Sequence, residues 1–281
     1  MWDRRKLLLA AVIFSTVYCR VAAKRMDMAP DAVDDQYNGC RKEALETFIH
    51  SGLLRQELNN SEIFQQAWNR NKECSKSIPG GEKEHAVALS TYANEDNFIS
   101  HTFNTAVKTQ GTNSSTYANF NFKSLHFLLM DSLKQLNSSD CKAVYFSPEP
   151  EINYEVKTGS VVRFGTFLTV YLSLDAVPTD LDDDIVFNIT SCFFAKLGDN
   201  SCTKDKKSAL LSPAEEFTVE GIFKKQHGDA EYTEVVLKHS RMNSFNNCYL
   251  FPRSGSPAHL STQWLVLLLL TFFFFFFIVE Q

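Results

Sequence analysis

The sequence lacks the short motifs by which many proteins hold a nucleotide, a metal ion or a reactive serine. It has no Gly-x-Gly-x-x-Gly stretch and no phosphate-binding loop, so a nucleotide would have to be held in another way. No two cysteines have the Cys-x-x-Cys spacing of a zinc site, and the seven histidines are scattered. The stretch "SGSPA" (254–258) does not complete the Gly-x-Ser-x-Gly turn of a serine hydrolase. We therefore expect neither a metal ion nor serine hydrolase chemistry.

Two further absences concern the chain as a whole. No proline- or glycine-rich linker divides it, and its length suits one large domain or two small ones. Basic residues are outnumbered, with 28 Lys and Arg against 33 Asp and Glu and a net charge of −5. An acidic chain repels the phosphates of nucleic acid, so we expect no nucleic-acid partner.

The N-terminus has the features of a secretory signal peptide. Three basic residues, Arg4, Arg5 and Lys6, precede an apolar stretch from Leu7 to Cys19, and small residues follow at the position where signal peptidase cuts. The apolar stretch is too short to span a bilayer comfortably, which argues against an uncleaved signal anchor. We expect residues 1–23 to be removed.

The C-terminus ends in an apolar tail that includes six consecutive phenylalanines. Residues Trp264–Val279 number only 16, whereas a spanning helix needs about 20. Small residues at 254–256 and a polar spacer precede this tail, which is the order found in signals for a glycosylphosphatidylinositol anchor. The alternative is a short uncleaved tail anchor. We expect residues 256–281 to be removed and residues 24–255 to form the mature domain.

Cysteine and asparagine patterns agree with an extracellular chain. Six cysteines lie between residues 24 and 255, and an even number in a secreted chain suggests disulfides, although the sequence alone leaves their pairing open. Four asparagines in the Asn-x-Ser/Thr pattern predict a glycosylated surface: Asn59, Asn113, Asn137 and Asn188.

Helical periodicity dominates the first half of the chain and strand-like runs dominate the second. Apolar residues recur every three or four positions in residues 41–54 and again in 122–136. After Cys141 the β-branched and aromatic runs are "KAVYF", "GSVVRFGTFLTVYL", "DIVFNITSCFF", "EEFTVEGIF", "EYTEVVLKH" and "NCYLF". Helices first and strands later predict an α+β fold with a mostly antiparallel sheet.

Several of these stretches together resemble the vertebrate ecto-mono-ADP-ribosyltransferases, secreted or glycolipid-anchored enzymes that use NAD. The segment "MAPDAVDDQYNGC" (28–40) is similar to the family's opening segment around D-D-Q-Y-x-G-C. The stretches "FNTAVKTQG" and "FKSLHFLLMDSL" are similar to its helical half, and "GSVVRFGTF" to its R-F-G-Q-F strand. The resemblance covers nearly all of residues 28–250. It implies an N-terminal helical part followed by a mostly antiparallel two-sheet β core.

The resemblance also implies two disulfides. Cys40 matches the family cysteine that pairs near the C-terminus, which is Cys248 here, and Cys141 matches one that pairs with Cys192. The two remaining cysteines fall outside the family pattern, and only the even count suggests that they pair with each other.

The motifs that hold NAD in the family are changed in this chain. Transfer from NAD breaks the bond to nicotinamide through a cationic ribose, so the site must hold the pyrophosphate and set a carboxylate near the developing charge. The family's Y-R-G strand supplies an arginine for this, but here Tyr145 is followed by Phe146, which cannot donate a hydrogen bond to phosphate. The first serine of the family's Ser-x-Ser strand corresponds to Thr169, which keeps a hydroxyl, and Arg163 matches the R-F-G arginine. The resemblance thus implies Tyr145, Arg163 and Thr169 as cofactor-binding residues, with Thr169 also catalytic.

The family's E-x-E pair falls in the stretch "SPAEEFTVEG" (212–221). Matching the apolar alternation of the strand makes Glu216 the catalytic carboxylate and puts Ala214 at the position of the acceptor-binding glutamate. A shift by one residue would keep Glu215 for the acceptor but put Phe217 at the catalytic position. We prefer Glu216, and the alternative is that both glutamates merely begin a solvated strand.

Two functions therefore remain open from the sequence. The first is extracellular, glycolipid-anchored, NAD-dependent mono-ADP-ribosylation of arginine in a protein acceptor, with NAD as substrate. The second is a catalytically silent recognition module on the same fold. Either would act on the outer face of the plasma membrane, held there by a lipid anchor, or after release from the cell.

Overall fold

The computed structural model describes residues 24–94, 98–137, 140–149, 154–178, 181–182, 184–203 and 205–251. The signal peptide and the C-terminal tail expected from the sequence, including the small residues at 254–256, lie outside these residues. Among the described helices, none combines the length and hydrophobicity needed to cross a bilayer.

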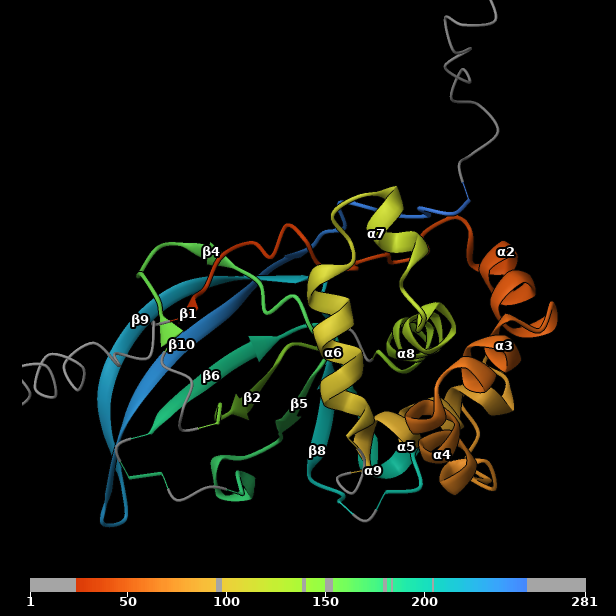
Figure 1. Cartoon of the computed structure of the whole chain (residues 1–281). Helices are drawn as coiled ribbons and strands as arrows, with labels where there is room; N and C mark the ends of the chain where they lie inside the picture. Colours follow the sequence, from red (N-terminus) through yellow and green to blue (C-terminus); the bar gives the residue numbers. More distant parts are fainter. Residues whose placement is uncertain are drawn as a thin grey trace, which may run out of the picture.

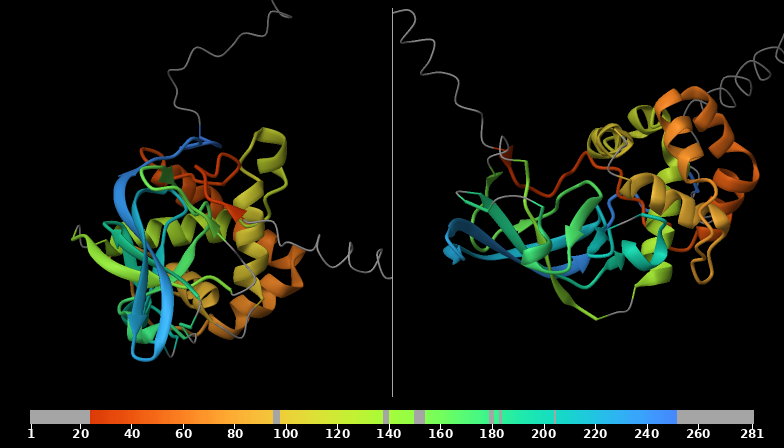
Figure 2. Two further views of the ribbon diagram at one scale, coloured as in Figure 1. Left: turned by 90° about the vertical axis from the view of Figure 1, so that its left-hand side faces the viewer. Right: turned by 90° about the horizontal axis from the view of Figure 1, so that it is seen from below.

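Helices occupy the first half of the chain and gather at one end of the molecule (Figures 1 and 2). Their bounds are α2 Arg41–Leu45, η1 Glu46–His50, α3 Leu53–Asn60, α4 Glu62–Asn71, α5 Lys83–Ala93, α6 Ile99–Thr109, α7 Ser114–Ala118 and α8 Lys123–Leu136, with short helices later at η2 Leu174–Ala176 and α9 Leu197–Asn200. Helix α8 confirms the predicted apolar periodicity of 122–136, because Leu125, Leu129 and Leu133 are fully buried.

Strands occupy the second half and form an eight-stranded sheet. Their bounds are β2 Lys142–Phe146, β4 Val161–Val162, β5 Leu168–Tyr171, β6 Ile185–Ser191, β7 Phe194–Lys196, β8 Ser208–Leu211, β9 Glu215–His227 and β10 Ala230–Met242, and the spatial order is β4-β9-β10-β6-β2-β5-β8-β7. Only β10 and β6 are parallel in this sheet. A separate two-stranded parallel sheet joins β1 Lys24–Arg25 to β3 Tyr154–Glu155. The predicted α+β class with a mostly antiparallel sheet is confirmed.

Two predicted strand runs differ from the structure. The run "GSVVRFGTFLTVYL" is divided into β4 and β5 by a turn at Gly165, whose φ is +67°. A Cβ added there would lie 2.3 Å from the Cβ of Ala29, so the close approach of the N-terminal segment requires glycine. The run "NCYLF" (247–251) forms turns rather than a strand.

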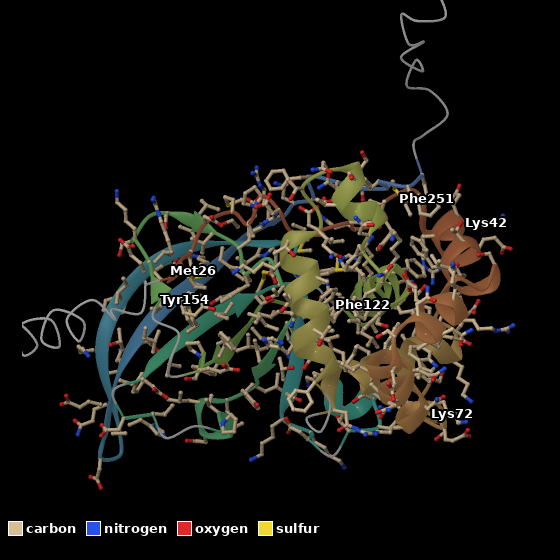
Figure 3. The ribbon with its side chains drawn as sticks, viewed as in Figure 1. Met26, Lys42, Lys72, Phe122, Tyr154 and Phe251 are labelled. Carbon is tan, nitrogen blue, oxygen red and sulfur yellow. A yellow bond between two sulfur atoms is a disulfide. The ribbon has the colours of Figure 1, made fainter. Side chains whose placement is uncertain are left out.

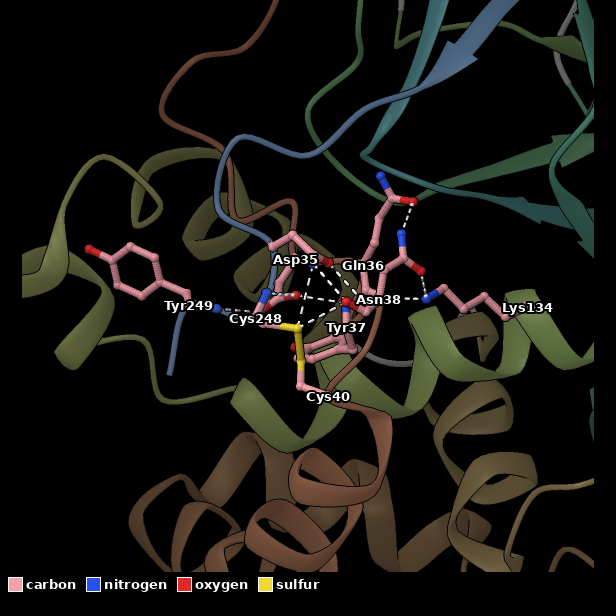
Figure 4. Close-up of a disulfide and its surroundings, with 9 residues drawn as sticks. Asp35, Gln36, Tyr37, Asn38, Cys40, Lys134, Cys248 and Tyr249 are labelled. Carbon is pink, nitrogen blue, oxygen red and sulfur yellow. Dashed lines mark hydrogen bonds between the residues drawn. A yellow bond between two sulfur atoms is a disulfide. The ribbon is translucent and has the colours of Figure 1, made fainter. Parts of the chain in front are cut away.

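Those turns form because the carboxylate of Asp35 accepts hydrogen bonds from the backbone of the C-terminal segment (Figure 4). Its carboxylate accepts from the N–H groups of Cys248 at 2.8 Å and Tyr249 at 3.1 Å, and from that of Tyr37 at 2.7 Å. Burial raises the pKa of Asp35, and these backbone donors oppose that shift. The Cys40–Cys248 disulfide closes the same junction, so the segment before α2 and the segment after β10 are fixed together.

The described residues form three disulfides, and two are the pairings that the resemblance implies, Cys40–Cys248 and Cys141–Cys192. The third joins Cys74 to Cys202 across 128 residues, which connects the loop after α4 to the loop after α9. Closing loops of this length removes conformational freedom from the unfolded chain.

Two large clusters of buried side chains fill the molecule. One lies among the helices and includes Phe48, Phe103, Phe127 and Phe167. The other lies along the sheet and includes Val144, Phe187 and Phe217. The two clusters meet around β5, where Phe167 belongs to the first cluster and Val170 to the second.

Candidate active site

Strand alternation sends the two adjacent glutamates of β9 to different partners. Glu215 is fully buried, and its carboxylate accepts from Ser191 Oγ at 2.7 Å, Cys192 N at 3.0 Å and His239 Nδ1 at 2.7 Å. The Glu215 carboxylate raises the pKa of His239, while partial burial of the ring opposes that shift. The carboxylate of Glu215 thus accepts from three protein donors, and these hydrogen bonds link β9 to β10 and to the end of β6.

Glu216 accepts two hydrogen bonds, one of them from an exposed side chain. Arg241 Nε donates to its Oε2 at 2.8 Å, and Asn243 Nδ2 donates to its Oε1 at 2.7 Å. The side chain of Glu216 is 2% exposed and that of Arg241 is 68% exposed, so Arg241 covers the carboxylate from the solvent side. The alternative that both glutamates begin a solvated strand is wrong, because both are buried.

Arg163 is buried and bonded mainly to the protein itself. It donates from Nη1 to Asp34 Oδ2 at 2.8 Å and to the Asn243 carbonyl at 3.0 Å, and its guanidinium lies 4.6 Å from the ring centroid of Phe245. Nε and Nη2 donate to the carbonyls of Met28 and Ala29. Four of the five N–H groups of a guanidinium are thus engaged. Asn243 contacts both Arg163 and Glu216, so the structure brings these two predicted residues together through it.

Thr169 and Tyr145 lie on the neighbouring strands β5 and β2. Thr169 is half-buried and contacts the hydroxyl of Tyr92, whose pKa burial raises well above its usual value. Tyr145 pairs with Tyr171 in the register between the two strands, and its ring packs against a small cluster around Val177. These two residues make their contacts away from the Arg163–Asn243–Glu216 group.

Phe146 belongs to a group of packed rings. Its ring lies 5.8 Å from Phe164, edge to face, and 6.1 Å from Phe187, stacked. Tyr154 packs on Phe187 at 5.3 Å, and Phe217 on Phe164 at 6.1 Å. The position at which the resemblance expects an arginine is therefore part of the apolar cluster along the sheet. We call these five side chains the aromatic cluster.

A cavity of about 150 Å³ opens beside the aromatic cluster. Phe164, Tyr154 and Met26 line its apolar side, and Figure 3 labels the last two on the strand side of the molecule. Arg25, Lys108 and Arg163 bring positive charge to it, and Asp27 and Asp31 bring negative charge. Pockets for whole cofactors usually exceed about 300 Å³, so this cavity has room for part of a dinucleotide.

The predicted glycosylation sites differ in accessibility. Asn59 is exposed near the end of α3, and Asn113 is exposed where it caps α7 with its Oδ1. Asn137, which follows α8, is half-buried. Asn188 is half-buried within β6, and its Nδ2 donates to Glu234 Oε1 at 3.0 Å.

Sequence reasoning missed Arg241, Asn243 and His239. All three meet the glutamates of β9 only because β10 returns beside it, with Arg241 directly opposite Glu216 in the register. No local motif marks such partners, and only the hairpin register could have identified them. In the part of the chain that the structure describes, no group of His, Cys, Asp and Glu side chains is arranged to hold a metal ion.

Comparison with known proteins identifies the family of this chain. Residues 26–244 match the family model described as NAD:arginine ADP-ribosyltransferase. The chain belongs to this family. The matched residues span the helical half and the eight-stranded sheet, and they include Arg163 and Glu216.

Named members of the ADP-ribosyltransferase family match over most of their length. Ecto-ADP-ribosyltransferase 5 of Rattus norvegicus is 29% identical over 86% of this chain and 84% of its own length. The GPI-linked NAD(P)(+)–arginine ADP-ribosyltransferase 1 of Mus musculus is 30% identical over 78% of this chain and 72% of its own.

Solved structures of the family share the fold. The mono-ADP-ribosyltransferase ART2.2 superimposes with a TM-score of 0.62 at 26% identity, covering 80% of this chain and 98% of the other. A variant of ART2.2 in complex with NAD gives 0.61 at 27% identity, with the same coverage.

Proposed function

We propose that this chain is a cell-surface mono-ADP-ribosyltransferase that transfers ADP-ribose from NAD to arginine side chains of a protein acceptor. Support comes from family membership, from the relative named as GPI-linked and from the ART2.2 variant that binds NAD. The observation that carries the proposal is Glu216, a buried carboxylate that is paired with the exposed side chain of Arg241.

Glu216 suits the chemistry better than Glu215. Cleavage of NAD develops positive charge on the ribose, and a fixed carboxylate nearby stabilises that charge. Glu215 already satisfies three donors inside the protein. Glu216 has one fixed donor, Asn243, and one exposed donor, Arg241, which can swing aside when a substrate enters.

Position 146 is Phe146 where the resemblance expects an arginine. NAD, the donor of ADP-ribose, must therefore be bound by other residues. Arg163 has four of its N–H groups engaged, so we propose that it acts on NAD through its charge and by fixing Asn243. Arg25 and Lys108 line the cavity and offer further positive charge for the pyrophosphate, which Asp27 and Asp31 on the same lining offset in part. Thr169 on β5 and Tyr145 on β2 stay proposed as cofactor-binding residues, although the described lining of this cavity includes neither.

We also propose secretion and a glycolipid anchor for residues 24–255. The signal-like N-terminus, the disulfides and the tail with its small-residue site support this location. Phosphatidylinositol-specific phospholipase C should release the protein from intact cells. Retention on the membrane with the Phe run still attached would contradict the anchor.

One observation favours a second function, that of a silent recognition module. Phe146 packs in the aromatic cluster, so it offers no donor to phosphate.

Titration calorimetry of the secreted domain with NAD, followed by assay of nicotinamide release with and without agmatine, separates the two functions. Binding together with agmatine-stimulated release supports the transferase. Absence of binding at millimolar NAD supports the recognition module.

A further inference from the structure

Asp34 begins the Asp-Asp-Gln-Tyr stretch near the N-terminus, and its side chain is fully buried. Its Oδ2 accepts from Phe245 N at 2.9 Å, and its Oδ1 accepts from Asn246 N at 3.2 Å and from Ser244 Oγ at 3.3 Å. Three donors from consecutive residues after β10 thus meet one carboxylate. Because a buried carboxylate is costly unless it is paired and hydrogen-bonded, these contacts fix the segment after β10 against the N-terminal segment.

The same carboxylate fixes Arg163. Arg163 Nη1 donates to Asp34 Oδ2 at 2.8 Å, and neither side chain has exposed surface. Nη1 also donates to the Asn243 carbonyl at 3.0 Å, so the guanidinium lies between Asp34 and Asn243. Asp34 therefore supports Asn243 in two ways, through Arg163 and through the backbone of the three residues that follow Asn243.

Asn243 is the point at which these contacts meet the candidate carboxylate. Its Nδ2 donates to Glu216 Oε1 at 2.7 Å, and its backbone N–H donates to the Ala214 carbonyl at 3.0 Å. The other carboxylate oxygen of Glu216 accepts from Arg241, whose side chain is 68% exposed. The position of Glu216 thus depends on Asn243 for its buried donor.

We propose that Asp34 is a positioning residue of the active site, which holds the Glu216 carboxylate in place through Asn243. The inference rests on the proposed transferase function, because it concerns the carboxylate that stabilises the ribose cation. Such a group has to be held within about 0.5 Å of its productive position. A misplacement of about 1 Å can lower the rate about 10²-fold.

The adjacent aspartate provides a matched control. Asp35 is 1% exposed, and its carboxylate also accepts from backbone N–H groups after β10, those of Cys248 and Tyr249. These residues lie farther along the chain than the partners of Asp34, and the disulfide of Cys248 fixes them as well. Asp35→Asn therefore removes the same kind of group from the same junction and leaves the support of Asn243 in place.

The test measures nicotinamide release by the purified full chain over a range of NAD concentrations, with rates corrected for the folded fraction seen by circular dichroism. Asp34→Asn should lower kcat about 10- to 100-fold and leave KM for NAD within about threefold, because the contact acts on the transition state rather than on NAD binding. Asp35→Asn should lower the urea midpoint and keep kcat within about twofold of wild type. A wild-type kcat in Asp34→Asn, or equal losses of kcat in both variants, overturns the inference.

Variants of Asn243 test whether Asp34 acts through it. Asn243→Ala should lower kcat by a factor similar to that of Asp34→Asn, and the double variant should lose little more, because the two residues act in series. Asn243→Asp sets a second carboxylate beside Glu216, and the repulsion should move the acid side of the rate–pH profile to higher pH. Additive losses in the double variant, or an unchanged profile in Asn243→Asp, overturn the inference and leave the transferase intact.

A milder variant serves if Asp34→Asn does not fold. Ser244→Ala removes one donor to Asp34 from a half-buried side chain and should lower kcat about twofold in wild type but not in Asn243→Ala. An equal effect in both backgrounds, or none in wild type, overturns the inference. Absence of nicotinamide release from wild type removes the proposed transferase function, and the inference with it.

Discussion

Replacing Phe146 by arginine tests whether the aromatic cluster has displaced a phosphate-binding side chain. Phe146 is half-buried on β2 and packs on Phe164 and Phe187. The cavity beside Phe164 is lined by Arg25 and Lys108, so a guanidinium at position 146 can join their positive charge. The substitution should weaken the fold and strengthen NAD binding at the same time.

The loss of stability can be estimated from the packing. Each aromatic pair contributes about 0.5–1.5 kcal/mol beyond its buried area, and two pairs are lost. Half of the burial of a phenylalanine side chain adds about 1 kcal/mol. Phe146→Arg should therefore lower the free energy of unfolding by about 2–4 kcal/mol without NAD. The matched variant Phe146→Leu keeps most of the apolar burial and should lose about 1 kcal/mol less.

Urea denaturation of the three proteins with and without NAD measures both effects. A ligand at 100 times its dissociation constant stabilises the folded state by about 2.7 kcal/mol. NAD should therefore raise the urea midpoint of Phe146→Arg much more than that of wild type or Phe146→Leu. Equal NAD-induced shifts in all three proteins would refute the reasoning that position 146 limits donor binding.

The remaining predictions concern the fold, its pH dependence and its surface. Arg163→Met leaves the buried carboxylate of Asp34 without its charged partner. The free energy of unfolding, measured by urea titration, should fall by about 3–5 kcal/mol. A loss below about 1 kcal/mol would show that the pair is dispensable. Glu215 raises the pKa of His239, so the stability from this pair is present below the unfolded histidine pKa of about 6.5 and is lost as pH rises through the raised folded pKa. His239→Gln should remove that part of the pH dependence, and an unchanged profile would contradict it. Asn113→Gln should reduce the mass of the secreted protein by one glycan. Asn188→Gln should not, because Asn188 lies within β6 and its Nδ2 donates to Glu234. The reverse pattern in intact-mass spectra would show that modification precedes folding of the sheet.

The helices and the order of elements could be predicted from the sequence, because each depends on residues that lie close together along the chain. The apolar repeat of 122–136 depends on the geometry of a single helix, and α8 has its buried face where the repeat predicts it. The run "KAVYF" likewise became β2 with its predicted bounds. Such patterns are set by residues a few positions apart.

The differences arise where distant segments meet. Residues 247–251 have strand composition, but Asp35 takes the backbone N–H groups that a strand would use. Arg163 resembles a ligand-binding arginine in sequence, yet Asp34 and the carbonyls of the N-terminal segment take most of its donors. These partners lie more than 120 residues away along the chain, so no local pattern indicates them.

The candidate carboxylate could be inferred from strand alternation, but its surroundings could not. Alternation separates Glu215 from Glu216 without saying which face each side chain occupies. The β9–β10 register decides that His239 meets the first and Arg241 the second. That register depends on two shifts in the hairpin, near Val236 and His239, which composition does not predict.

The most direct test of the account compares nicotinamide release from NAD by wild type, Glu216→Gln and Glu215→Gln. Wild type should release nicotinamide, and Glu216→Gln should release it about 10²–10³ times more slowly, as expected when a charge-stabilising group is removed. Glu215→Gln should lower the urea midpoint and still release nicotinamide while folded. Release from Glu216→Gln at the wild-type rate, or loss of release only in Glu215→Gln, would contradict the assignment of Glu216 as the carboxylate of this active site.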